Sequence, residues 1–179
     1  MRPLIFLDMD DVVCLDDQYH SSEMLLYFQE KKPDSAELWE HLVSTTAAEN
    51  LRQLHTEFVP IYVISSSWAT FLSREQMCEA LTRTGLEFIV ENLHDEWRTP
   101  RALSSSRRDE IEWWLEANRE PGQAFLVIDD THSGYTLTGS YLAHEGHLVL
   151  CSAGGRTGFN SDKLEIARRR LLRQVGDKA

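Results

Sequence analysis

The feature of the sequence that most limits its fold is a regular alternation of short apolar runs with longer stretches of helical periodicity. The runs are rich in β-branched and aromatic side chains, as buried strands are. They span residues 4–7, 61–64, 87–90, 124–128 and 147–150. The alternation predicts an α/β fold, a three-layer α/β/α sandwich in which helices cover both faces of a mostly parallel central sheet.

Helices are expected in the stretches between the runs. The expected helices span residues 21–29, 35–43, 45–57, 74–84, 107–118 and 162–174. Ser106 and Asp109 have the spacing of a capping box, which begins a helix at the next residue. Asn160 or Ser161 would begin the last helix. No repeat or linker divides the sequence, so a single domain is expected over residues 1–179.

The stretch from residue 12 to about residue 44 is too long to be a direct turn from the first strand into a helix. We interpret it as an insertion of two short helices that meet near Pro33. It would form a small cap or flap over the end of the first strand. A peripheral decoration without a role at the site is the alternative.

The charge balance argues against a long nucleic-acid partner. The chain has 29 acidic residues against 18 lysines and arginines, a formal net charge of −11. Such a surface repels a phosphodiester backbone, so no extended nucleic-acid groove is expected. The basic run at residues 168–173 is interleaved with leucines and is interpreted as the solvated face of a helix.

Other sequence features limit the location of the protein. No stretch approaches the roughly 20 apolar residues of a membrane span, and Met1 leads into the first apolar run rather than a signal peptide. The three cysteines lie far apart, which argues against a disulfide scaffold or a structural zinc site. We therefore expect a cytoplasmic protein with no membrane partner.

Polar residues follow three of the apolar runs. The first run leads into Asp8-Met9-Asp10, the second into Ser65-Ser66-Ser67 and the fourth into Asp129-Asp130. Because the carboxyl ends of parallel strands meet at one edge of the sheet, we expect these side chains to lie close together. Carboxylates at such an edge repel one another unless a cation lies between them, and Mg²⁺ prefers hard oxygen ligands. The acidic pairs therefore predict a magnesium site, with a solvated turn as the alternative for either pair alone.

Two arginines open one of the expected helices. Arg107 and Arg108 follow Ser106 and lie in the first turn, where the helix dipole disfavours cations. In one interpretation, Asp109 and Glu110 compensate them locally. In the other, one of the two arginines reaches an anionic phosphate at the carboxylate cluster.

The order of these motifs resembles the haloacid dehalogenase (HAD) superfamily of phosphohydrolases that use an aspartate nucleophile. The matching features are Asp8-x-Asp10-x-Val12, a serine after a hydrophobic strand, a basic residue opening a helix, and Asp129-Asp130. Within the superfamily, the chain resembles the HAD domain of Swiss army knife RNA repair proteins. Residues 64–68, 107–115, 127–130 and 157–159 carry that resemblance.

The resemblance implies a magnesium-dependent phosphatase that hydrolyses a phosphate monoester through an aspartyl-phosphate. It makes Asp8 the nucleophile and Asp10 the acid that protonates the leaving oxygen and later activates water. Ser65, Ser66 and Arg107 would bind the phosphate. The chain departs from the pattern at the third motif, where lysine is usual. Spacing to the apolar residues of the helix favours Arg107 over Arg108.

The resemblance also implies a set of metal ligands. Asp8, the backbone carbonyl of Asp10, and Asp129 would hold Mg²⁺, with Asp130 as the alternative to Asp129. Many relatives have glycine where this chain has Asp11, whose carboxylate has no implied role.

The substrate would be a phosphorylated small molecule, such as a nucleotide, or a nucleic-acid end. The alternative from another class is a non-catalytic phosphate- or partner-binding module. A receiver domain would carry its acceptor aspartate where this chain has Ser65, and a halide-removing enzyme would not need Asp10. Trp68, His132 and residues 154–156 are further candidates for substrate contact, with burial or a plain loop as the alternative.

Overall fold

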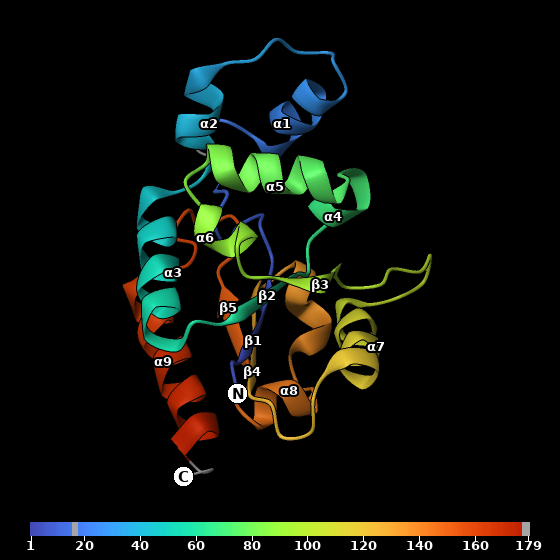
Figure 1. Ribbon diagram of the computed structural model, residues 1–179, viewed down its shortest axis with the longest axis vertical. Helices are drawn as coiled ribbons and strands as arrows, with labels where there is room; N and C mark the ends of the chain where they lie inside the picture. Colours follow the sequence, from blue (N-terminus) through green and yellow to red (C-terminus); the bar gives the residue numbers. More distant parts are fainter. Residues whose placement is uncertain (16–17, 177–179) are drawn as a thin grey trace.

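A five-stranded parallel sheet forms the centre of the computed structural model, which describes residues 1–15 and 18–176 (Figure 1). The strand order is β3-β2-β1-β4-β5, and every pair is parallel. The strands are β1 (Leu4–Leu7), β2 (Ile61–Ile64), β3 (Leu93–Arg98), β4 (Phe125–Asp130) and β5 (Leu148–Cys151). The central strand β1 therefore pairs with β2 on one side and with β4 on the other.

Helices connect the strands and cover both faces of the sheet, as the sequence predicted. The helices are α1 (Ser21–Phe28), α2 (Ala36–Leu42), α3 (Thr45–Phe58), α4 (Trp68–Phe71), α5 (Arg74–Arg83), α6 (Glu87–Val90), α7 (Arg107–Asn118), η1 (Ser133–Leu137), α8 (Tyr141–His144) and α9 (Ser161–Gly176). Three layers result, and the predicted α/β/α fold is confirmed.

Alternate side chains of β1 show how the layers are held together. Ile5 and Leu7 pack into the larger buried cluster, with α3, α5, α6 and α9, whereas Leu4 and Phe6 pack into the smaller one, with α7, η1 and α8. Phe6 meets Trp114 of α7 edge to face, with ring centroids 5.2 Å apart. Burial on both faces explains why β1 is a continuous apolar run rather than an alternating one.

One predicted strand is wrong. Residues 87–90 were expected as a strand and form the short helix α6, while the third strand is β3. A four-residue apolar run has no periodicity that separates a strand from a buried helical turn. The strand β3 escaped prediction because it is an edge strand with exposed polar residues such as Asp95 and Glu96. The other predicted elements begin and end within one or two residues of their predicted bounds, whereas the short helices α4, η1 and α8 were not predicted.

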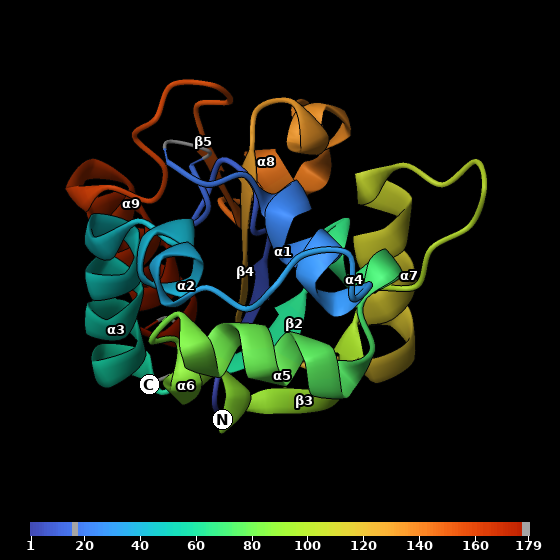
Figure 2. The ribbon, with the colours of Figure 1, turned by 90° about the horizontal axis from the view of Figure 1, so that it is seen from above.

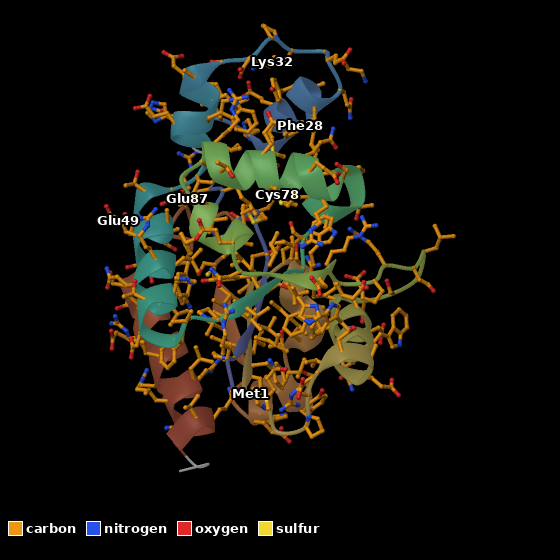
Figure 3. All side chains as sticks on the ribbon, in the orientation of Figure 1. Met1, Phe28, Lys32, Glu49, Cys78 and Glu87 are labelled. Carbon is orange, nitrogen blue, oxygen red and sulfur yellow. The ribbon has the colours of Figure 1, made fainter. Side chains whose placement is uncertain are left out.

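The insertion after β1 forms two helices, α1 and α2, above the carboxyl ends of the strands (Figures 1 and 2). Its base is closed by a hydrogen bond of 2.8 Å from the Ser44 amide to the Val13 carbonyl. Figure 3 shows Phe28 and Lys32 of the insertion above α5, which carries Cys78. A role as a cap or flap stays a prediction.

Arg83 of α5 fastens the insertion to the rest of the fold. Its Nη2 donates two hydrogen bonds of 2.7 Å to the carboxylate of Asp34, and its guanidinium lies 4.4 Å from the centre of the Trp39 ring. The Tyr27 hydroxyl also donates to Glu79 of α5 at 3.1 Å. These contacts explain why the insertion packs against α5.

Among the residues that the structure describes, no helix is both long and apolar enough to cross a membrane.

We expect Arg83→Ala to loosen the insertion without unfolding the sheet. The ion pair is partly exposed, so its loss should raise the population of the opened insertion only a fewfold. Limited proteolysis should show faster cleavage between Tyr19 and Asp34. Arg74→Ala is the matched control, because Arg74 lies on the same helix and donates to Asp95 rather than to the insertion. Equal cleavage rates in the two variants would contradict this role for Arg83.

Candidate active site

The carboxyl ends of β1, β2 and β4 and the first turn of α7 meet at one point of the fold. Asp8 follows β1 directly, Ser65 follows β2, and Asp129 lies at the end of β4. The Asp8 amide donates to Ile128 at 3.0 Å and the Ser65 amide donates to Leu7 at 2.9 Å, so sheet pairing continues past β1. The chain moves outward from β1 in one direction through β2 and in the other through β4, and ligands bind at such a switch point.

Three carboxylates lie together here, on Asp8, Asp129 and Asp130. One oxygen from each lies within 4.8 Å of the others, and all three residues are at most 2% exposed. The Asp8 Oδ1 accepts a hydrogen bond of 2.8 Å from the Met9 amide, and the Asp129 Oδ1 accepts one of 2.9 Å from the Asp130 amide. Backbone amides thus fix both carboxylates and leave the Oδ2 atoms for other partners.

Arg107 is the cation of this cluster. Its Nε lies 2.9 Å from the Asp129 Oδ2 and its Nη2 lies 3.6 Å from the Asp8 Oδ2. Residues 107, 111 and 114 share one face of α7, because the spacing follows the helical period. Burial of Ile111 and Trp114 against the sheet therefore aims Arg107 at the carboxylates. Arg108 points elsewhere, with its Nε 2.7 Å from Glu112.

Four buried polar side-chain atoms make no hydrogen bond in the described part of the chain, and all four belong to this site. They are Asp8 Oδ2, Ser65 Oγ, Arg107 Nε and Asp129 Oδ2. Arg107 Nε and Asp129 Oδ2 are within ion-pair distance, but their geometry is not that of a hydrogen bond. A buried polar group without a partner costs about 1–3 kcal/mol, so the arrangement favours a site whose atoms are completed by a ligand.

Burial and mutual repulsion raise the proton affinity of the carboxylates. Burial, together with the negative charge of Asp129, raises the pKa of Asp8 well above its ordinary value. Burial raises the pKa of Asp129 to about 6, although Arg107 acts in the opposite direction. Burial lowers the pKa of Arg107, but Asp129 and Asp8 outweigh it, and the net pKa is raised. One guanidinium balances only one of three negative charges, so the donor set fits a divalent cation such as Mg²⁺.

Asp10 lies beside the cluster rather than in it. Its Oδ1 accepts a hydrogen bond of 3.0 Å from the indole Nε1 of Trp68, and its Oδ2 accepts one of 3.3 Å from the Ser67 hydroxyl. Trp68 is 1% exposed, so the expectation that it could stack on a substrate is wrong. The tryptophan instead orients the carboxylate of Asp10.

Asp11 has a structural role that the sequence did not reveal. Its φ is +57°, in the left-handed region that glycine and, less often, aspartate adopt. Its Oδ1 accepts a hydrogen bond of 2.9 Å from the Gly154 amide. Asp11 thus joins the loop after β1 to the loop after β5.

The loop after β4 also depends on residues that sequence reasoning missed. The Asp130 Oδ1 accepts hydrogen bonds from the amides of His132, at 2.5 Å, and Ser133, at 3.0 Å, and so begins η1. A Cβ on Gly134 would lie 3.3 Å from the Asp129 carboxyl carbon and 2.8 Å from Leu150. A larger residue would crowd the Asp129 carboxyl and require Leu150 to move, so glycine suits this close approach of η1. The His132 side chain itself is exposed.

Glu110, expected only as a local partner for the arginines, has a wider set of contacts. It is 4% exposed. Its Oε2 lies 3.5 Å from Arg107 Nη1, and its Oε1 lies 3.7 Å from Arg101 Nε and accepts from the Ser105 hydroxyl at 2.8 Å. The sequence offered one indication of this role: Glu110 lies in the first turn of a helix that begins with two arginines.

Comparison with known proteins identifies a family. A family model described as the HAD domain in Swiss Army Knife RNA repair proteins matches residues 4–164, which include all five strands and the insertion. No curated protein and no solved structure matches the chain.

We expect the metal-free protein to lose stability as the pH rises. The folded-state pKa values of Asp8 and Asp129 are raised, so their contribution is complete below the ordinary pKa of 3.8 and is lost, for Asp129, as the pH passes about 6. For Asp129 the difference amounts to roughly 3 kcal/mol. Urea unfolding in EDTA at pH 4, 5, 6 and 7.5 measures it.

Asp129→Asn should remove much of this decline, whereas Asp95→Asn, at an exposed position on β3, should keep it. Magnesium at pH 7.5 should raise the melting temperature of the parent and have little effect on Asp129→Asn. An unchanged pH dependence in Asp129→Asn would show that burial does not raise the pKa of this carboxyl.

Proposed function

The chain belongs to the family of HAD domains of Swiss Army Knife RNA repair proteins, and from this premise we propose that it is a magnesium-dependent phosphatase. One observation carries the proposal: the four buried polar atoms without a hydrogen bond in the described residues are all at the site. They comprise two carboxylate oxygens, a hydroxyl and a guanidinium nitrogen, which together suit a phosphate and a cation.

Asp8 is the nucleophile of the proposed reaction. Its Oδ2, which has no hydrogen bond, attacks phosphorus, and the bond from phosphorus to the ester oxygen breaks. Asp10 donates a proton to that oxygen, so the alcohol leaves and Asp8 carries the phosphoryl group. Asp10 then takes a proton from water, which attacks the aspartyl-phosphate and releases inorganic phosphate. The contacts of Asp10 with Trp68 and Ser67 hold it in place for both transfers.

Arg107 and Ser65 bind the phosphoryl oxygens. The guanidinium offers several donors in a fixed plane, and the buried Ser65 hydroxyl makes no hydrogen bond to any of the residues described. Ser66 is buried, and its hydroxyl lowers the pKa of the Asp8 carboxyl, so we assign it first to positioning the nucleophile. In phosphoryl transfer, most of the catalysis comes from such positioning and from charge stabilisation.

The residues present fit Mg²⁺. Asp8 and Asp129 would hold it with the Asp10 carbonyl, Asp8 through the Oδ1 that is not used in the attack and Asp129 through its Oδ2, which makes no hydrogen bond within the described residues. The Asp130 Oδ1 accepts hydrogen bonds from two backbone amides. Asp130 is therefore the second choice as a direct ligand. When bound, the cation offsets the carboxylate charge and polarises the phosphoryl oxygens.

The substrate proposed for this site is a phosphate monoester on a nucleotide or a nucleic-acid end. The description of the family, which names RNA repair proteins, supports this class. A phosphate-binding module without catalysis would need neither the free Asp8 Oδ2 nor a carboxylate poised as Asp10 is.

We expect phosphate release from p-nitrophenyl phosphate that requires magnesium and is abolished in Asp8→Asn, because an amide is a poor nucleophile. Asp10→Asn should distinguish esters. The first step should slow by about 10²–10⁴-fold with an alkyl phosphate, whose alkoxide needs a proton, and far less with the nitrophenyl ester. Single-turnover kinetics on both esters measure this. Full activity in Asp8→Asn would refute the mechanism, and equal losses in Asp10→Asn would refute its acid role.

We expect Arg107→Ala to weaken inhibition by vanadate by about tenfold to a hundredfold, since a hydrogen bond to a charged group contributes about 1.5–3 kcal/mol. Arg108→Ala is the matched control, because Arg108 lies next in sequence and pairs with Glu112. Arg107→Lys keeps the positive charge next to Glu110, so it tests whether unfolding, rather than loss of the guanidinium, explains the weaker inhibition in Arg107→Ala. A larger effect in Arg108→Ala would show that the wrong arginine has been assigned.

A further inference from the structure

A groove of about 590 Å³ borders the site between α4, the segment after β3, and α7. That segment extends away from the molecule before the chain returns to α7 (Figure 1). The groove is within the size range of small-molecule sites, roughly 300–1,000 Å³. The residues that line the groove, apart from Ser66 and Glu110, have no part in the mechanism proposed above.

Two residues connect the groove to the proposed phosphate site. Ser66 lines it, is buried and directly follows Ser65 in the chain, and Glu110 lines it and lies 3.5 Å from Arg107. A phosphate ester bound by Arg107 therefore has the groove as an adjacent space for the part of the substrate beyond the phosphate.

The outer part of the groove combines an exposed aromatic ring with guanidinium groups. Trp113 is 45% exposed, although the next residue of α7, Trp114, is buried. The Arg101 side chain is 51% exposed and donates to the Thr70 hydroxyl at 2.9 Å. Arg98 lines the same groove and is also exposed.

These groups match the parts of a nucleotide. Nucleobases stack on exposed aromatic rings, and arginines bind phosphodiesters. The surroundings limit the length of such a ligand, because the protein carries a formal net charge of −11. A terminal nucleotide or two fits this balance, and a long strand does not.

We propose that the groove binds the nucleotide next to the scissile phosphate, with its base stacked on Trp113 and its phosphodiester paired with Arg101. This proposal rests on the proposed function for the position of the scissile phosphate. It places the specificity of the enzyme in α7 and the segment after β3, on the edge-strand side of the sheet.

The test compares kcat/KM for p-nitrophenyl phosphate with kcat/KM for 3′- and 5′-phosphorylated dinucleotides. The wild-type protein should prefer one of the dinucleotides by at least about tenfold. In Trp113→Ala and Arg101→Ala the ratio of the two kcat/KM values should fall about tenfold, mainly through KM. Tyr141→Ala is the matched control, because Tyr141 is 42% exposed on α8 and lies outside the groove.

Calorimetry on Asp8→Asn protein gives a second readout that does not need turnover. The preferred dinucleotide should bind this protein about tenfold more weakly when Trp113→Ala is added. Failure to release phosphate from p-nitrophenyl phosphate would overturn the proposed function, and the calorimetry would still report on the groove. Unchanged ratios and dissociation constants in both groove variants, or a preference for a phosphopeptide over the dinucleotides, would overturn the present proposal.

Discussion

Three carboxylates buried around one guanidinium are the arrangement on which the rest of this structure depends. Like charges at this distance repel, and burial removes the water that would screen them. Backbone amides offset part of this repulsion. The amides of Met9 and Asp130 donate hydrogen bonds to the carboxylates of Asp8 and Asp129. Such amides are fixed only if the strands that carry them are fixed, and this requirement explains why β1 is buried on both faces.

Packing far from the site determines where its charges lie. Trp114 meets Phe6 of β1 edge to face, and this contact sets the rotation of α7 about its axis. Arg107 lies two helical turns earlier on the same face, so apolar packing brings its guanidinium to the carboxylates. Glu110, one turn from Arg107, links that guanidinium to Arg101 at the mouth of the groove. The proposed phosphate contact and the proposed nucleotide groove thus share one helix.

Local signals in the sequence account for what could be predicted. The capping box of Ser106 and Asp109 and the period of α7 are contained within one helix, so the amino-acid pattern alone was enough to prefer Arg107 over Arg108. The strand-end motifs could be grouped because parallel strands share an edge. The bond from Gly154 to Asp11 joins residues 143 positions apart, and no local pattern encodes it. Burial of Trp68 and the identity of the third strand likewise depend on tertiary contacts.

The central place of β1 also governs the order in which the fold can be assembled. β1 is synthesised well before β4: it can pair with β2, but its other neighbour begins only at Phe125. Until β4 is complete, one edge of β1 is open and Asp8 lacks both Asp129 and Arg107 as neighbours in their final positions. Pairing over so long a stretch of chain is slow. The proposed cation, which needs both aspartates, would therefore bind only the finished sheet and would stabilise the product of the last folding step rather than start the first.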